Sequence, residues 1–431
     1  MKTVIMAGGK GTRISSIASD IPKPMIPIDG MPVLEREIHN LKEQGFTDII
    51  ITVSHLGNII MDYFGDGSNI SPVTGEKFGV HIEYFYEEIP LGNAGALFKL
   101  KDKLTEDFLL LNADAIFDID FNRFVNYHKK MNGLVTLFTH PNNHPYDSGL
   151  IIANKEGVVI QWLSKEDERP VYYKNRVNAG LHVMSPKVLE MEINTPKIDL
   201  DRQVLKPLCS TGKVYVYDSP EYVKDMGTPE RYHLVEENFK NGVVEGKNLK
   251  NKQKAIFLDR DGTINKLVAF LKNIDDFELI DGVDEAIKCM NELGYLVIVT
   301  TNQPVIARGD VTFDELELIH NKMETLLGNN GAYIDAIYYC PHHPDKGFEG
   351  EVKELKFDCD CRKPKPGMIL KAASDFNIDL RNSYMVGDTI NDIMAGKNSN
   401  CKTVLISKEY QSLGEDLYFE SLTDFAKSLN K

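Results

Sequence analysis

The amino-acid sequence predicts a two-domain α/β protein. The chain has 431 residues, which is long for one domain and suits two domains of about 200 residues each. Short β-rich runs alternate with helical stretches, and this alternation is typical of α/β sheets. It is interrupted once, at residues 241–253, where the sequence is polar and rich in lysine and asparagine, and then it resumes. We therefore expect two Rossmann-like domains, residues 1–240 and 254–431, joined by a linker.

The individual elements follow from local patterns. In the first domain, strands are expected at "TVIMAG", "DIIITVS", "HIEYFYE" and "FLLLNAD". The stretch "MPVLEREIHNLKEQG" has the apolar spacing of an amphipathic helix and ends at Gly45. In the second domain, strands are expected at "AIFLD", "YLVIVTTN", "SYMVGD" and "KTVLI".

Composition excludes several classes of protein. The formal net charge is −15 and no block is rich in lysine or arginine, so a nucleic-acid partner is not expected. No apolar run approaches the roughly 20 residues of a membrane span, and the N-terminus lacks a secretory pattern. Six cysteines in a chain of this size do not indicate a disulfide framework, so a reducing cytoplasm is the expected compartment. A homo-oligomer is compatible with the sequence, which leaves the oligomeric state open.

A glycine-rich loop follows the first predicted strand. In "AGGKGTR", Gly8, Gly9 and Gly11 allow backbone N–H groups to converge on an anion. No Lys-Ser/Thr follows the last glycine, so this is not a P-loop. Arg13 ends the loop, and Lys23 in "PKPM" adds a second cation, which together favour a polyphosphate cradle. Taken alone, the loop is equally compatible with a plain turn, and Lys23 with a solvated surface lysine.

The second domain opens with "FLDRDGT". Asp259 ends a predicted strand and Asp261 follows two residues later, so both carboxylates can face one point above the sheet. One of them can attack phosphorus while the other transfers a proton. Such a pair is also common in turns and helix caps.

Further along, Cys340, His342, Cys359 and Cys361 form a C-x-H…C-x-C set that suits tetrahedral Zn²⁺. His343 is an alternative ligand to His342. Four protein ligands leave no open position, so the site is expected to be structural and to hold the loop that carries Arg362 and Lys363.

The first half resembles the sugar-phosphate nucleotidylyltransferases. The resemblance rests on "AGGKGTR…PKPM", followed in the order of that family by "EEIPLGNAGAL", "LLNAD", "RVNAGLHVMSP" and "VKDMGTPERY". It implies that a sugar 1-phosphate oxygen attacks the α-phosphorus of a nucleoside triphosphate and releases pyrophosphate. Positioning and charge neutralisation dominate such catalysis.

The same resemblance implies roles for individual residues. Asp114 and Asp225 would bind Mg²⁺. The triphosphate would be held by Gly8, Gly9, Gly11, Thr12, Arg13 and Lys23, the base would lie against Gly92 and Asn93, and the sugar side would include Lys165, Asn178 and Gly180. Asn93, Ala113 and Ser164 depart from the usual residues of the family, which affects the substrate more than the chemistry.

The second half resembles the haloacid dehalogenase superfamily of phosphatases over about residues 254–406. Beside "FLDRDGT", the resemblance rests on "VIVTTNQ", "CRKPKPGM" and "MVGDTIND". It implies an aspartyl-phosphate on Asp259, with Asp261 protonating the leaving alcohol and then activating water. Thr301 and Lys363 would contact the phosphoryl group. Mg²⁺ would be held by Asp259, Asp388 and the backbone carbonyl of Asp261.

A narrower resemblance follows from the Cys/His set, "TNQPVIARG" and "FELIDGV". The second half is similar to the D-glycero-D-manno-heptose 1,7-bisphosphate 7-phosphatases, and histidinol-phosphate phosphatases share the layout. Asn302, Arg308 and Arg362 would then face the substrate, while Pro304-Val305 replaces the usual Ser-Gly. The first half most resembles the D-glycero-α-D-manno-heptose 1-phosphate guanylyltransferases.

Together the two resemblances predict successive steps toward a GDP-heptose, with small sugar phosphates and a nucleoside triphosphate as the partners. Two alternatives stay open. Both chemistries could act on another sugar or polyol phosphate with CTP, or one half could be an inactive binding or scaffolding module.

Overall fold

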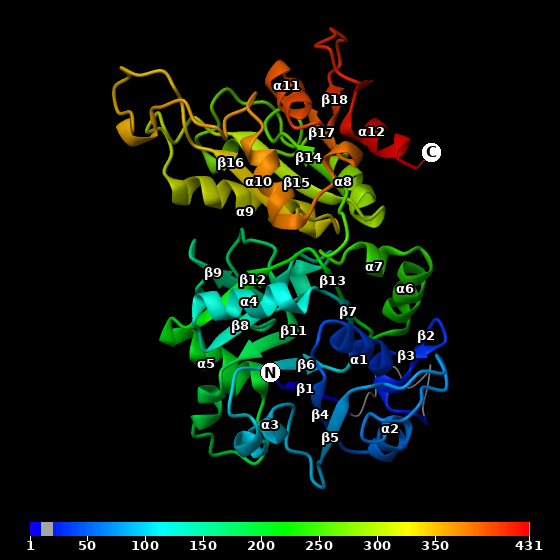
Figure 1. Ribbon diagram of the computed structural model, residues 1–431. Coiled ribbons are helices and arrows are strands. Elements are labelled where there is room, and N and C mark those ends of the chain that lie inside the picture. Colours follow the sequence, from blue (N-terminus) through cyan, green and yellow to red (C-terminus); the bar gives the residue numbers. More distant parts are fainter. Residues whose placement is uncertain (10–19, 431) are drawn as a thin grey trace. The chain divides into compact units, whose positions relative to one another are not determined.

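The computed structural model describes residues 1–9 and 20–430. The chain divides into two compact units (Figure 1). The first unit comprises Met1–His140, Ile151–Leu163 and Asn178–Asn248, and the second comprises Pro141–Leu150, Ser164–Val177 and Leu249–Lys431. Both units are built on α/β sheets, so the predicted fold class is confirmed.

Among the described residues, the main sheet of the first unit has nine strands in the order β10-β9-β11-β6-β1-β4-β5, with β8 and β12 off this path. Strand β1 pairs in parallel with β4 and β6, while β11 runs antiparallel to β6. A separate antiparallel pair joins β7 to β13. The bounds are β1 (Thr3–Met6), β4 (Asp48–Val53), β5 (His81–Tyr86), β6 (Phe108–Asn112), β7 (Ala115–Asp118), β8 (Val135–His140), β9 (Leu150–Ala153), β10 (Val159–Leu163), β11 (Val177–Met184), β12 (Val214–Asp218) and β13 (Tyr222–Asp225), with β2 (Pro27–Ile28) and β3 (Met31–Pro32) as a short hairpin.

The helices of this unit begin and end at recognisable signals. The predicted amphipathic helix is α1, and Gly45 with a φ of +88° lies just beyond its end. Thr228 is the N-cap of helix α6, and its side chain accepts from the Arg231 N–H. The helix itself begins with a proline. The bounds are α1 (Val33–Glu43), α2 (Gly57–Phe64), α3 (Gly95–Lys99), α4 (Phe121–Met131), α5 (Lys206–Leu208), α6 (Pro229–Lys240) and α7 (Val243–Gly246). Helix α7 lies in the stretch that we expected to be a linker, and its Val244 is buried.

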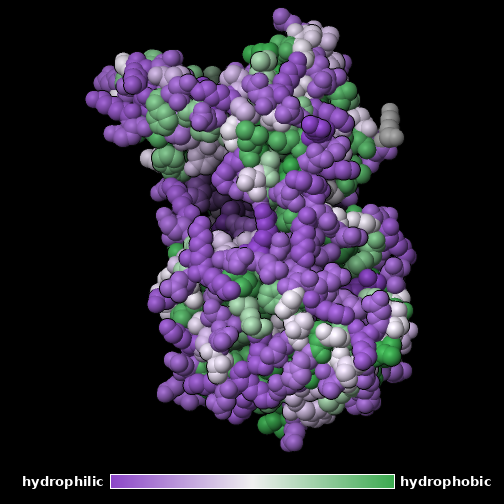
Figure 2. All heavy atoms as spheres, in the orientation of Figure 1, coloured by the Kyte–Doolittle hydropathy of each residue, from purple (hydrophilic) through white to green (hydrophobic). Residues whose placement is uncertain are grey.

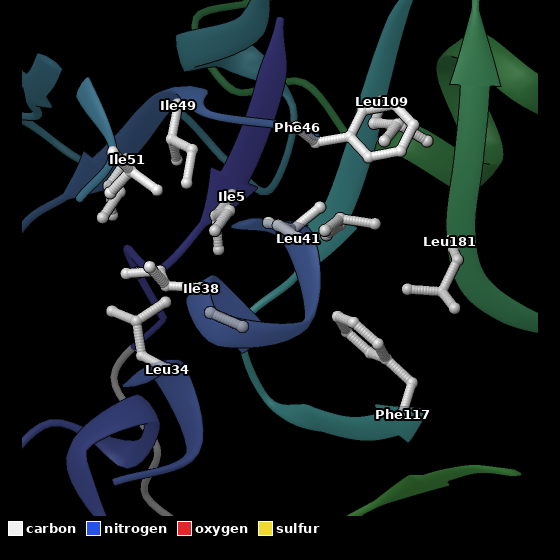
Figure 3. Close-up of a cluster of buried hydrophobic side chains, with 14 of the residues drawn as sticks. Ile5, Leu34, Ile38, Leu41, Phe46, Ile49, Ile51, Leu109, Phe117 and Leu181 are labelled. Carbon is white, nitrogen blue, oxygen red and sulfur yellow. The ribbon is translucent and has the colours of Figure 1, made fainter. Parts of the chain in front are cut away.

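Helix α1 packs on one face of the sheet. Figure 3 shows its Leu34, Ile38 and Leu41 lying close to strand residues such as Ile5 and Ile49. All of these side chains are buried. Burying a leucine or isoleucine side chain stabilises a fold by about 1.5–3 kcal/mol, so this cluster fixes the strands that lead to the first candidate site.

The second unit has a sheet of six parallel strands in the order β16-β15-β14-β17-β18-β19. Counted along the chain this is the order 3-2-1-4-5-6 of doubly wound folds, and ligands bind where such an order reverses, here between β14 and β17. Helices α8, α9 and α12 bury residues in one hydrophobic cluster, while α10 and α11 contribute to another. The bounds are β14 (Ala255–Leu258), β15 (Leu296–Asn302), β16 (Ala336–Cys340), β17 (Tyr384–Gly387), β18 (Lys402–Ile406), β19 (Leu417–Phe419), α8 (Val283–Glu292), α9 (Phe313–Asn329), α10 (Gly367–Phe376), α11 (Ile390–Asn398) and α12 (Leu422–Ser428).

Two short segments of the second unit come from the first half of the sequence. The backbone N–H of Tyr173 donates to Thr325 Oγ1 at 2.9 Å, and that of Asn175 donates to Glu324 Oε2 at 2.8 Å. Both acceptors lie on α9 and are buried. Residues 164–177 therefore supply donors to polar side chains of α9.

The surface agrees with the acidic, polar composition. Hydrophilic side chains cover most of the face seen in Figure 2, and apolar ones occur in small groups. In the part of the chain that the structure describes, no helix combines the length and the apolar character that crossing a bilayer requires.

Two candidate active sites

Three carboxylates meet at the reversal point of the second sheet. Asp259 follows β14, Asp388 follows β17, and the adjacent parallel pairing places them side by side. The Asp259 N–H donates to the Val386 carbonyl at 2.9 Å, which fixes its backbone against β17. Asp392, in the first turn of α11, completes the group, and one carboxylate oxygen of each residue lies within 4.8 Å of the others.

Lys363 is the cation of this group. Its ammonium lies 2.8 Å from Asp259 Oδ1 and 2.5 Å from Asp392 Oδ1. Burial and Asp392 raise the pKa of Asp259 to about 7, although Lys363 opposes the shift. Burial and Asp392 likewise raise the pKa of Asp388 to about 6. The carboxylates outnumber the lysine, so a further cation would stabilise the site.

The group fits a divalent metal ion. Asp388 Oδ1 is buried and has no hydrogen-bond partner among the described residues. Gly262 has a φ of +90°, and a Cβ at this position would lie only 2.1 Å from Asp388 Oδ2, so the backbone approaches this carboxylate closely. Carboxylate oxygens are the ligands that Mg²⁺ prefers.

Asp261 is held by a separate set of donors. The guanidinium of Arg260 donates to both carboxylate oxygens, at 3.0 and 2.8 Å. Asn265 Nδ2 donates to Oδ1 at 3.0 Å, and Gln303 Nε2 donates to Oδ2 at 2.9 Å. Arg260 itself is fully buried. This network fixes the orientation of the carboxylate that was predicted to transfer protons.

The remaining predicted residues of this site have defined places. Thr301 is buried, near the end of β15. Asn302 exchanges two hydrogen bonds of 3.0 Å with the backbone of Lys363, so its carboxamide holds the lysine loop. Arg308 pairs with Asp310 at 2.9 Å and lies over the Phe270 ring. Arg362 donates to the His342 carbonyl at 3.2 Å.

Three of the six cysteines and one histidine lie close together, and two of these cysteines stand in the loop that precedes Lys363. The ligand atoms of Cys340, His342, Cys359 and Cys361 all lie within 4.8 Å of one another. Cys359 Sγ lies 3.4 Å from Cys340 Sγ and 3.2 Å from Cys361 Sγ, and His342 Nδ1 lies 3.3 Å from Cys361 Sγ. The ring of His343 instead accepts from the Asp345 N–H at 3.2 Å. Three thiols and an imidazole form a closed set that fits a tetrahedral metal ion.

The first unit contains a pocket of about 810 Å³ at the carboxyl ends of β1 and β6. Its lining includes several predicted residues: Gly8, Gly9, Lys23, Gly92, Asn93 and Asp114. Gly11, Thr12 and Arg13 lie outside the described residues. Lys23 Nζ donates to Asp114 Oδ2 at 3.0 Å, so the predicted phosphate ligand and the predicted metal ligand are direct neighbours.

The two predicted metal ligands of the first unit lie on adjacent stretches of backbone: Asp225 ends β13, and Asp114 directly precedes β7. Asp225 lies opposite Ala115 in the β13–β7 pair, and the Met226 N–H donates to the Asp114 carbonyl at 3.4 Å. Arg231 holds Asp225 through two contacts of 2.8 and 2.7 Å. Burial opposes ionisation of Asp225, but Arg231 and the Gly227 N–H outweigh it and lower the pKa of this carboxyl. Two carboxylates in neighbouring positions fit Mg²⁺.

Glycines allow close backbone approaches at the positions predicted to face the base and the sugar. Gly92 has a φ of +86°, and a Cβ there would lie 2.3 Å from the Ile198 carbonyl, while Asn93 Oδ1 accepts from the Leu200 N–H at 2.7 Å. Gly180 has a φ of +77°, and a Cβ there would lie 2.5 Å from Asn112 Nδ2.

Of the other residues expected on the sugar side, Asn178 lies beside Gly180 and Lys165 lies in the second unit. Asn178 Oδ1 accepts from the Gly180 N–H and contacts the His182 ring. Lys165 is exposed and belongs to the second unit, in the segment 164–177.

Sequence reasoning did not single out five polar residues that the structure adds to these sites: Glu87, Arg231, Arg260, Gln303 and Asp392. Asp392 could have been predicted from the sequence, because it stands four residues after Asp388 and can form a capping box with Thr389. Arg260 stands inside the quoted motif, but its burial could not be read from the sequence.

Two family models match different parts of the chain, one in each half. A family model described as nucleotidyl transferase matches residues 2–242, and one described as HAD-hydrolase-like matches residues 360–429. The D-glycero-beta-D-manno-heptose-1,7-bisphosphate 7-phosphatase of Pasteurella multocida is 42% identical over 181 residues, which cover 41% of this chain and 96% of that protein. The protein of the same name from Escherichia coli K12 is 40% identical over 183 residues, covering 41% and 94%. The crystal structure of HddC from Yersinia pseudotuberculosis aligns with 26% identity and a TM-score of 0.46, covering 55% of this chain and 99% of that one.

Proposed function

The chain belongs to the nucleotidyl transferase family, its C-terminal part belongs with the D-glycero-beta-D-manno-heptose-1,7-bisphosphate 7-phosphatases, and from this premise we propose a bifunctional enzyme of nucleotide-activated heptose biosynthesis. Its C-terminal site removes the 7-phosphate of heptose 1,7-bisphosphate. Its N-terminal site transfers GMP from GTP to heptose 1-phosphate and releases pyrophosphate. The observation that carries the proposal is the presence, in one chain, of two separate lysine–carboxylate sites. Lys363 contacts the group of Asp259, Asp388 and Asp392, and Lys23 contacts Asp114, whose backbone neighbours that of Asp225.

In the phosphatase reaction, an Asp259 carboxylate oxygen attacks the phosphorus of the 7-phosphate. The bond from phosphorus to the sugar oxygen breaks, and Asp261 gives its proton to that oxygen. Asp261 then takes a proton from water, which attacks the aspartyl-phosphate and regenerates Asp259. Lys363 and Thr301 neutralise and bind the phosphoryl oxygens. Asp259 and Asp388 would hold Mg²⁺, which would supply the charge that lets two anions approach each other.

In the transferase reaction, a phosphate oxygen of heptose 1-phosphate attacks the α-phosphorus of GTP. The bond from the α-phosphorus to the bridging oxygen breaks, and pyrophosphate leaves. Lys23 lies in the pocket beside Asp114 and is positioned to hold the triphosphate. Asp114 and Asp225 would hold Mg²⁺, which would supply charge neutralisation. The chain itself provides positioning and does no covalent chemistry at this site.

The chemistry of the two steps supports heptose as the shared substrate. Removing the 7-phosphate of a 1,7-bisphosphate leaves a sugar 1-phosphate, which is the substrate class of the nucleotidylyltransferases that the first half resembles. A chain that contains both sites can therefore carry out both reactions in sequence.

One feature of the pocket supports guanine. Glu87 lies in the pocket, accepts from the Leu91 N–H at 3.2 Å and is next in space to Gly8. Burial raises the pKa of Glu87, so this carboxylate gains from a ligand that donates to it. Guanine offers adjacent N1–H and N2–H₂ donors, whereas the corresponding edge of cytosine offers a single donor, N4–H₂, beside the N3 and O2 acceptors.

The full-length protein tests the proposal. Phosphate release from heptose 1,7-bisphosphate and pyrophosphate formation from heptose 1-phosphate with each nucleoside triphosphate are measured separately. Asp259→Asn should abolish phosphate release and spare pyrophosphate formation, and Asp114→Asn should do the reverse. If either substitution left both activities unchanged, the site it affects would be wrongly assigned.

A further inference from the structure

Gln303 joins the two groups that the phosphatase reaction needs beside its nucleophile. It follows β15, and its backbone N–H donates to the Cys340 carbonyl at 2.8 Å. Its side chain is buried, with 2% exposed, and makes three hydrogen bonds. Nε2 donates to Asp261 Oδ2 and to Thr301 Oγ1, both at 2.9 Å, while Oε1 accepts from Arg260 at 3.1 Å.

The partners fix which end of the carboxamide faces which group. An arginine side chain can only donate, so the atom of Gln303 beside Arg260 must be the oxygen. The nitrogen is then the atom that donates to Asp261 Oδ2 and to Thr301 Oγ1. The contact with Arg260 alone thus fixes the orientation of the amide.

This orientation determines what the Thr301 hydroxyl does. Because Gln303 Nε2 donates to Thr301 Oγ1, the oxygen acts as an acceptor in that contact and keeps its own proton for another partner. Within the described part of the chain, the Thr301 hydroxyl makes no hydrogen bond besides this one. A phosphoryl oxygen bound at the site would be an acceptor for that proton.

Arg260 and His320 hold this arrangement from behind. Arg260 NH1 lies 3.3 Å from His320 Nε2, and since arginine cannot accept, the imidazole nitrogen accepts. His320 lies on α9 and is buried. A buried arginine with three different acceptors has one favoured position, so it fixes Gln303 and Asp261 relative to each other.

We propose that Gln303 is a positioning residue of the phosphatase site. It directs the Thr301 hydroxyl proton toward the phosphoryl group and holds Asp261 in the orientation for proton transfer. The inference rests on the proposed phosphatase function and adds the residue that couples the two side chains.

The test compares two substrates in the full-length protein. 4-Nitrophenyl phosphate has a leaving group that needs no proton, so the first-turnover release of 4-nitrophenolate reports Thr301 and neither proton transfer by Asp261. Complete hydrolysis of heptose 1,7-bisphosphate releases an alcohol and needs both residues. In Gln303→Met, the first-turnover rate with 4-nitrophenyl phosphate should fall about tenfold and kcat with the bisphosphate roughly a hundredfold, while KM stays within about twofold.

A double-mutant cycle checks the route of the effect. In a Thr301→Val background, Gln303→Met should change the first-turnover rate with 4-nitrophenyl phosphate by less than about twofold, because the hydroxyl that Gln303 orients is gone. Additive losses would overturn the proposal. So would equal losses with the two substrates, or a change confined to KM.

Two further variants separate this role from stability. Gln253 is equally buried in the same unit and donates to the Asn251 carbonyl, so Gln253→Met is the matched control and should retain wild-type kcat. If Gln303→Met does not fold, Gln303→Glu replaces it, since it keeps the shape and the acceptor for Arg260 but has no donor. Wild-type protein that hydrolyses neither substrate would refute the proposed function, whereas active wild type with an equally active Gln303→Met refutes this inference alone.

Discussion

The ammonium of Lys363 lies 2.8 Å from the carboxylate of Asp259, although the two residues are far apart in the sequence. Lys363 lies in the loop that carries Cys359 and Cys361, and Asp259 directly follows the first strand of the second sheet, β14. The contact exists because the sheet reverses its order between β14 and β17 and the lysine loop closes over that point.

Replacing Lys363 tests this contact. Lys363→Met should lower kcat for phosphate release by about 10²–10³, because it removes a buried cation from the phosphoryl oxygens. Pyrophosphate formation should remain at the wild-type rate. Lys365, which is half-buried and pairs with Asp358, provides the control, and Lys365→Met should alter neither activity. A Lys363→Met enzyme with full phosphatase activity would contradict the role given to the lysine.

Removing the metal from the Cys/His set should destabilise the second unit. We expect one zinc ion per chain by elemental analysis, and its loss in Cys359→Ser together with a lower midpoint of thermal unfolding. Phosphate release should fall because the loop carrying Lys363 loses its anchor. Cys289, half-buried in the same unit but outside the set, is the control. Full zinc content in Cys359→Ser would rule out this ligand set.

Glu87 should control the choice of base. Wild-type enzyme should use GTP with a higher kcat/KM than ITP, which lacks the N2 amino group, by about 10-fold or more, since a site group left without its partner is costly. Glu87→Gln should reduce kcat/KM for GTP and narrow that ratio. The measurement is pyrophosphate release with each triphosphate. An unchanged ratio would show that Glu87 does not read this edge of the base.

Gly180 should be needed for the shape of the transferase pocket. Gly180→Ala forces a Cβ to within 2.5 Å of Asn112, a pocket residue, and adds the cost of a φ of +77°. Gly212 has a φ of +67° with open space around it, so Gly212→Ala carries the backbone cost alone, about 1 kcal/mol. Only Gly180→Ala should raise KM or lower kcat for pyrophosphate formation. Equal kinetics in the two variants would contradict this role.

His182 should make the first unit sensitive to acid. It is fully buried, and burial lowers its pKa to about 3. Below a pH of about 6.5 the unfolded chain binds a proton at this histidine and the folded chain does not, so stability is complete above that pH and is lost as the pH falls toward 3.

At pH 5 the loss from His182 should be about 2 kcal/mol relative to neutral pH. His182→Leu should remove this part of the pH dependence. Denaturant unfolding followed by tryptophan fluorescence measures it, because the sole tryptophan, Trp162, is buried in the first unit. Parallel pH profiles for wild type and His182→Leu would count against the prediction.

Much of the fold and part of each site could be read from the sequence. The eight predicted strands are present as β1, β4, β5, β6, β14, β15, β17 and β18. Most of them are continuous apolar runs that are largely buried, whereas β5 is partly exposed. Strands β8 and β12 were not predicted; they pair in parallel with each other although they lie far apart in the sequence.

The sequence alone determined the α/β class, the two groups of phosphate chemistry and the residue types that bind metals, because these depend on local spacing and side-chain chemistry. Only the tertiary structure decided that His342, and not His343, lies with the cysteines, that Asp392 joins Asp259 and Asp388, and that Gln303 bridges Thr301 and Asp261. Such contacts depend on which strands neighbour each other and where loops close, and a chain specifies these through its packed core as a whole.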